Sequence, residues 1–176
     1  MFRRLATTTT LVAMVAVGLG ACTPPGPEPT RTPADPSATP TQTPDLSEVA
    51  RATYEAYLQT TLELTSATDP SVQPLLDFAT PAQAALALSE VQVAIAEGLA
   101  LEGQWRVPEV QLIDDSPSAP VAVACPDNSG VIVIDQATGE STAPTPTIAR
   151  LVTFERADRL LVASVGEAPE GLAPCN

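Results

Sequence analysis

The apolar residues of this chain change their spacing at about Gly103, and that change restricts the folds that the chain can adopt. Between Asp45 and Gly98 they recur three and four residues apart, as on one face of a helix. After Gly103 the apolar and polar residues follow the shorter period of strands. Helices followed by an antiparallel sheet predict an α+β domain, with the N-terminal helices packed on the strands.

The first helix has a clear start signal. Asp45 and Glu48 have the spacing of a capping box, so we expect a helix from there to about Thr65. The residues predicted on its inner face are Leu46, Ala50, Thr53, Tyr54, Tyr57, Thr61 and Leu64. A short helical stretch is expected to follow Asp69-Pro70, with the apolar residues Leu75, Leu76 and Phe78.

The next long helix has equally clear limits. Thr80 is its expected N-cap, Pro81 its first helical residue and Gln83 the partner that completes a second capping box. Gly98 predicts its end. The residues of its core stripe are Ala84, Leu88, Val91 and Ile95.

Five strands are expected after Gly103. Turn residues separate five segments of strand character, at 109–113, 119–125, 131–134, 148–155 and 160–165. In the second strand, Val121, Val123 and Cys125 share one side, while Ala122 and Ala124 share the other. This face of small residues either lets a helix pack closely or leaves a hollow.

Residues 1–21 have the pattern of a secretory signal, with Arg3-Arg4 before an apolar stretch that is too short to cross a bilayer. Leu19-Gly20-Ala21-Cys22 resembles a bacterial lipobox. That resemblance implies transfer of diacylglycerol to the Cys22 sulfur and cleavage before this residue. The alternative is an ordinary signal with a chance cysteine. Both the general secretory route and the twin-arginine route stay open.

The segment 22–45 is expected to be the lipidated cysteine followed by a disordered linker, and 46–176 the folded domain. Eight of the 19 prolines lie within residues 23–45, among Thr, Ser and Ala. Such a composition favours polyproline II and cannot offset the entropy of ordering. A plain spacer is the simpler interpretation, and O-linked sugars on the Thr-Pro repeats are the alternative.

Composition excludes several classes of function. The chain has eight basic residues, 21 acidic ones and no histidine, and its formal net charge is −13. The missing histidine excludes Ser-His-Asp and Cys-His catalysis and zinc sites that need imidazole. The negative charge argues against nucleic acid as a partner. We expect no cofactor and no metal site, because no phosphate loop, calcium loop or paired metal ligands occur.

Two cysteines, Cys125 and Cys175, remain once Cys22 is assigned to lipid. In an exported protein two such cysteines most simply pair, so a structural disulfide is expected. A redox or metal role is disfavoured because the spacing is wide and no CxxC motif occurs.

In this order of features the chain resembles the nuclear-transport-factor-2-like (SnoaL-like) lipoproteins of actinobacteria. The resemblance rests on the tyrosine-bearing segment 52–57, the segment 74–80, and the strand 122–129 with its C-x-D-x-S ending. The Thr138-Gly139 turn and the terminal Pro174-Cys175 complete it. One departure is Leu160-Leu161, which stands where the family usually has a tryptophan before the last strand.

The resemblance implies a cystatin-like or nuclear-transport-factor-2-like cone, in which N-terminal helices pack on a curved antiparallel sheet around a hollow interior. Some members of the family are isomerases or dehydratases that use an Asp, Tyr or His inside the cone. We therefore take as candidate cone or pocket lining Tyr54, Tyr57, Trp105 and Asp127.

Each of these candidates also has a plain structural interpretation, which we favour. Asp127 is expected to cap a turn, the two tyrosines to pack in the core with satisfied hydroxyls, and Trp105 to pack normally. Asp114 and Asp115 are not expected to act as a carboxylate pair, because neighbours on a strand point to opposite faces. No residue is assigned a catalytic role.

Leu86 and Val93 form the candidate partner surface. They project from the side of their helix opposite the core stripe, alongside Glu90 and Glu97. Either the helix is covered on both sides, or a partner covers it there.

Three classes of function remain. The first is an exported lipoprotein on the outer face of the cytoplasmic membrane, whose non-catalytic domain docks another envelope protein or a second copy. The second is a carrier of a small apolar ligand, and the third an Asp-dependent isomerase or dehydratase. A sealed apolar core would exclude the last two, whereas an open cone with a buried Asp would favour the third.

Overall fold

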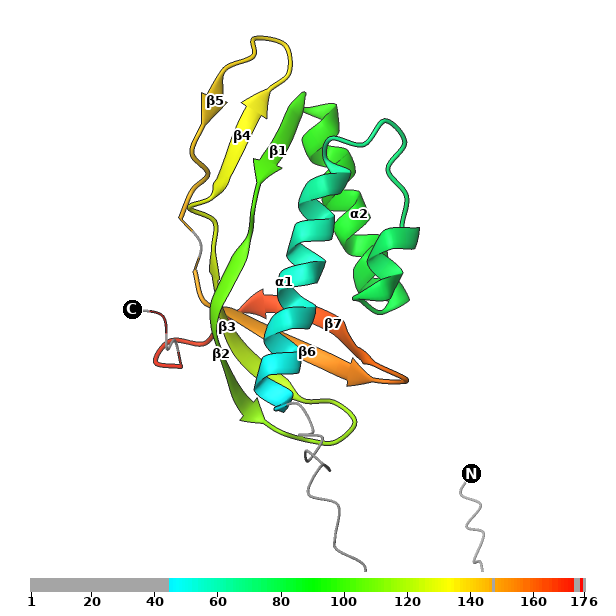
Figure 1. The fold of residues 1–176 in the computed structure, drawn as a ribbon, viewed down its shortest axis with the longest axis vertical. Helices are drawn as coiled ribbons and strands as arrows, with labels where there is room; N and C mark the ends of the chain where they lie inside the picture. Colours follow the sequence, from blue (N-terminus) through cyan, green and yellow to red (C-terminus); the bar gives the residue numbers. More distant parts are fainter. Residues whose placement is uncertain (1–44, 147, 173–174, 176) are drawn as a thin grey trace, which may run out of the picture. The chain divides into compact units, whose positions relative to one another are not determined.

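The computed structural model describes residues 45–146, 148–172 and 175. The predicted signal peptide, Cys22 and the linker up to residue 44 lie outside these residues. Within them the chain forms two helices, one short 3-10 helix and seven strands (Figure 1). The α+β class is therefore confirmed.

The helices lie where the sequence predicts them. Helix α1 spans Leu46–Leu64, the 3-10 helix η1 spans Gln73–Asp77, and α2 spans Pro81–Ala96. The Asp45 carboxylate accepts from the Ser47 N–H, and the Thr80 hydroxyl accepts from the Gln83 N–H. Beyond α2, Gly98 has a φ of +75°, the left-handed conformation that ends many helices.

The strands form two antiparallel sheets, whereas the sequence analysis expected one. Strands β1 (Leu99–Gly103), β4 (Val131–Asp135) and β5 (Ser141–Thr142) pair in the order β1-β4-β5. The other sheet has the order β2-β3-β6-β7. Its strands are β2 (Arg106–Asp114), β3 (Val121–Asp127), β6 (Arg150–Arg156) and β7 (Leu160–Glu167). Strands β1 and β5 were not expected from the sequence.

The helices pack on these sheets, and α1 contacts strands of both (Figure 1). Ala122 and Ala124 on β3 are fully buried in the same core as Tyr54. The face of small residues therefore packs against neighbours and forms no hollow. Leu160 at the start of β7 is also buried in this core.

Strand β2 is an edge strand, and side chains of α1 bind backbone N–H groups at its start. The Trp105 N–H, just before the strand, donates to Gln59 Oε1 over 3.1 Å. The Val107 N–H donates to Glu55 Oε2 over 2.9 Å. Helix α1 thus satisfies backbone donors that an edge strand otherwise leaves to solvent.

The connection from β1 to β2 passes very close to the turn that links β3 to β4. Gly103 has a φ of +110°, and a Cβ at this position would overlap the carbonyl oxygen of Gly130. Only glycine both adopts this φ readily and has no Cβ to collide with Gly130. This close approach lies at the point where one sheet gives way to the other.

Candidate functional site

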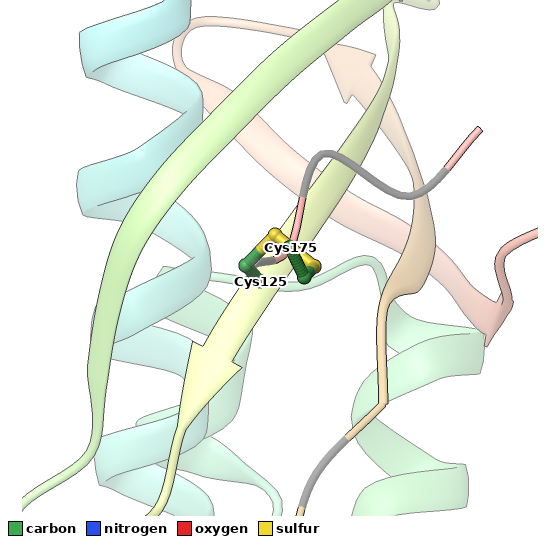
Figure 2. The surroundings of a disulfide bond; sticks show 2 residues. All are labelled: Cys125 and Cys175. Carbon is green, nitrogen blue, oxygen red and sulfur yellow. A yellow bond between two sulfur atoms is a disulfide. The ribbon is translucent and has the colours of Figure 1, made fainter. Parts of the chain in front are cut away.

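The predicted pairing of Cys125 with Cys175 is present in the structure (Figure 2). The two Cα atoms lie 5.5 Å apart, within the normal range for a disulfide. Cys125 lies on β3 and is buried, so the bridge ties the end of the chain to the four-stranded sheet.

Asp127 lies beside this disulfide and lines a different hollow from the other three candidate lining residues. It borders an open hollow with Cys125, Cys175 and Ser129. Its carboxylate accepts from the Ser129 N–H over 2.9 Å, and this bond stabilises the charged form and lowers the pKa of Asp127. This geometry is that of a turn cap.

Tyr54, Tyr57 and Trp105 meet in a different pocket, of about 310 Å³. It lies where α1 and α2 approach the ends of strands from both sheets, and its wall includes Leu58, Leu101 and Val165. We call it the tyrosine pocket. The structure thus places three of the four candidate lining residues in one pocket and Asp127 outside it.

The two tyrosine hydroxyls of this pocket have different partners. Tyr57 accepts a hydrogen bond from Gln83 Nε2 over 2.8 Å, which joins α1 to α2. Gln83 therefore does not complete the predicted capping box with its side chain, although its N–H is bound by Thr80. The Tyr54 hydroxyl has no hydrogen-bond partner among the described residues. Every fully buried polar side-chain atom among those residues has a hydrogen-bond partner. Because the Tyr54 hydroxyl has none, it is not fully buried, and it faces the open space of the pocket that Tyr54 lines.

Both phenols remain protonated near neutral pH. Burial raises the pKa of Tyr54 well above its ordinary value, and the Arg150 guanidinium offsets part of this rise. Burial also raises the pKa of Tyr57, the hydrogen bond from Gln83 lowers it, and the Glu90 carboxylate raises it again. Each hydroxyl therefore keeps its proton, and that of Tyr54 has no partner among the described residues and can donate to a ligand.

Three further residues of the pocket wall were not among the predicted site residues: Gln83, Glu90 and Arg150. Arg150 begins β6 directly opposite Ala124 of β3, so it lies on the core face of the sheet. The sequence contains a signal for this placement, because side chains two residues apart on a strand share a face. Arg150 is two residues before the buried Val152 and therefore lies on the same face of β6. The pairing of β6 with β3 that fixes its neighbours is a long-range contact.

The candidate partner surface on α2 is exposed in the domain. Leu86 is 53% and Val93 56% exposed. Leu86 borders the tyrosine pocket, whereas Val93 is absent from its wall. Within the described residues, no other element covers these two side chains, contrary to the alternative that the helix is covered on both sides.

Other candidate chemistry is absent from the part of the chain that the structure describes. Asp114 and Asp115 are exposed, and Asp114 accepts from the Ser116 N–H. The described residues contain no cluster of acidic or cysteine side chains able to hold a metal ion. None of their helices has the length and apolar character needed to span a membrane.

Comparison with known proteins leaves the family open. No protein-family model matches the chain, and no curated protein matches it. Among solved structures, the intermembrane space region of the chloroplast protein ARC6 is similar, with a TM-score of 0.38 and 8% sequence identity. The similarity covers 66% of this chain and 94% of that one. A likeness this weak carries no argument about function.

Proposed function

We propose that this protein is an exported lipoprotein, anchored through Cys22, whose domain binds a small apolar ligand in the tyrosine pocket. The observation that carries the binding proposal is the pocket itself. Its volume of about 310 Å³ is at the lower end of the range for small-molecule sites. An apolar wall with a few polar groups at fixed positions is also typical of such sites.

The anchoring part of the proposal rests on the lipobox-like residues 19–22 and the proline-rich segment after them. Two acyl chains hold a protein stably at a membrane, where one chain alone is marginal. The ligand-binding domain would then act on the outer face of the cytoplasmic membrane, without crossing it.

The nuclear-transport-factor-2-like cone is the finer fold assignment that we favour. Its support is the order of helices before antiparallel strands, together with a pocket bounded by helices on one side and strand ends on the other. In that fold the pocket would be the mouth of the cone. The Asp-dependent isomerase receives no such support, because Asp127 is half-buried, caps a turn and is absent from the wall of the pocket.

A titration with 1-octanol tests ligand binding, because Trp105 is the only tryptophan of the chain and lines the pocket. We expect its fluorescence to change saturably. Leu86→Glu places a charge at the rim and should weaken binding about fivefold or more. Val93→Glu is the matched control, since it changes an equally exposed residue of the same helix outside the pocket. Equal effects of the two substitutions, or no saturable binding, would contradict the proposal.

A docking role for α2 is the second candidate, and the exposure of Leu86 and Val93 supports it. The same two variants separate the roles. Loss of a crosslinked envelope partner or of a dimer in both variants, with octanol binding intact, would support docking. Light scattering and crosslinking on intact cells measure these outcomes.

A further inference from the structure

The tyrosine pocket has one positively charged end, formed by Arg150 beside the Tyr54 hydroxyl. We infer that the pocket selects a small apolar molecule with a carboxylate head, which binds Arg150 and the Tyr54 hydroxyl. This inference rests on the proposed binding function and names its ligand class.

Arg150 is a half-buried cation without a counter-ion among the described residues. Arg51 and Arg159 form ion pairs, with Glu55 and Asp77 respectively. Arg106 and Arg156 are exposed to solvent. Arg150 instead lines the pocket with no ion pair or side-chain hydrogen bond in the described part of the chain.

An unpaired cation is notable here because carboxylates are abundant. The chain carries 21 acidic residues, and Glu167 pairs with Arg150 across β6 and β7. Even so, the Glu167 carboxylate forms no ion pair with it. A half-buried guanidinium loses hydration, and a bound carboxylate would restore its hydrogen bonds in the favourable bidentate geometry.

The Tyr54 hydroxyl adds a donor at the same end of the pocket. The Tyr54 hydroxyl has no partner among the described residues, so its proton is free for a ligand. The Tyr57 hydroxyl, in contrast, already has the side chains of Gln83 and Thr61 as hydrogen-bond partners. The Tyr57 ring stacks on the Tyr54 ring, with centroids 6.2 Å apart.

The size and charge of the pocket limit the ligand further. At about 30 Å³ per water-sized group, 310 Å³ holds about ten non-hydrogen atoms, the size of octanoate. A single arginine matches one negative charge. Glu90 also lines the pocket and would repel a doubly charged phosphate.

The test compares octanoate with 1-octanol, which share a tail and differ in the head. The full-length chain with Cys22→Ala is used, so that no acyl chain competes, and Trp105 fluorescence and calorimetry report binding. Arg150→Gln should weaken octanoate binding about tenfold or more and change 1-octanol binding less than about twofold. Arg156→Gln, which removes an exposed arginine of the same strand, is the matched control and should leave both unchanged.

Two more variants complete the design. Glu90→Gln removes the one acidic side chain of the pocket wall and should strengthen octanoate binding. If Arg150→Gln disturbs folding, as judged by circular dichroism, Arg150→Lys keeps the charge and should retain octanoate binding. Two outcomes would overturn the carboxylate assignment and leave the proposed function standing. One is equal affinity of the unsubstituted protein for octanoate and 1-octanol. The other is an equal loss of affinity for both probes in a folded Arg150→Gln variant. Binding of neither probe would overturn the proposed function itself.

Discussion

At the scale of single residues, the hydrogen bond between Tyr57 and Gln83 is the contact that most clearly ties sequence to site. Both side chains are buried, at 5% and 7% exposure, and the bond joins the two helices at the wall of the pocket. A buried polar group is stable only while its partner is present. We therefore expect substitutions of Tyr57 and Gln83 to have coupled effects on the free energy of unfolding.

We expect Tyr57→Phe and Gln83→Leu each to lower the free energy of unfolding by about 1–3 kcal/mol, because each leaves one buried polar group unpaired. The double variant should cost less than the sum of the two, since it leaves neither group unpaired. Urea unfolding followed by circular dichroism measures all three. Strict additivity would show that the two side chains do not stabilise each other.

The sequence identified Tyr57 and Gln83 but not their contact. Helical spacing places Tyr57 on the inner face of α1, and the capping pattern places Gln83 at the start of α2. Which partner Gln83 takes depends on how the two helices pack, and local spacing does not contain that information. Arg150 shows the same limit, because only the pairing of β6 with β3 brings it to the pocket.

At the scale of elements, helices were easier to predict than strands. Both α1 and α2 carry capping residues and a repeating apolar face that act locally. Strand β1 begins directly after Gly98, and its residues Leu99, Ala100 and Leu101 favour helices as readily as strands. Strand β5 is two exposed residues long, so it has no apolar pattern to detect. The division into two sheets depends on the approach of Gly103 to Gly130, which is a tertiary contact.

The disulfide is the covalent link between elements, and its loss should have a defined effect. Cys125 and Cys175 are 50 residues apart, and closing such a loop stabilises the fold by about 4 kcal/mol in the chain-entropy model. Replacing both by Ser should therefore lower the free energy of unfolding by up to that amount. Denaturant unfolding of the oxidised parent and the double variant measures the difference. Labelling of Cys125 or Cys175 as a free thiol in the native protein would contradict the pairing.

At the scale of the whole molecule, the proposed anchor and the folded domain are separate in sequence. The domain begins at the Asp45 cap, and the proposed lipid site is Cys22. We expect Cys22→Ala to leave the domain folded and to release it from the membrane, because the lipid alone would hold it there. Cell fractionation with immunodetection measures this. A cleaved variant that stays with the membrane would contradict lipid anchoring.

The bonds from α1 to the start of β2 have a consequence for encounters between two copies of this domain. An open strand edge can recruit the edge of a neighbouring molecule and begin a growing, extended sheet. Here Glu55 and Gln59 already occupy the N–H groups of Val107 and Trp105, and Pro108 has no N–H to offer. Residues 105–108 at the start of this edge are therefore poor at recruiting another chain.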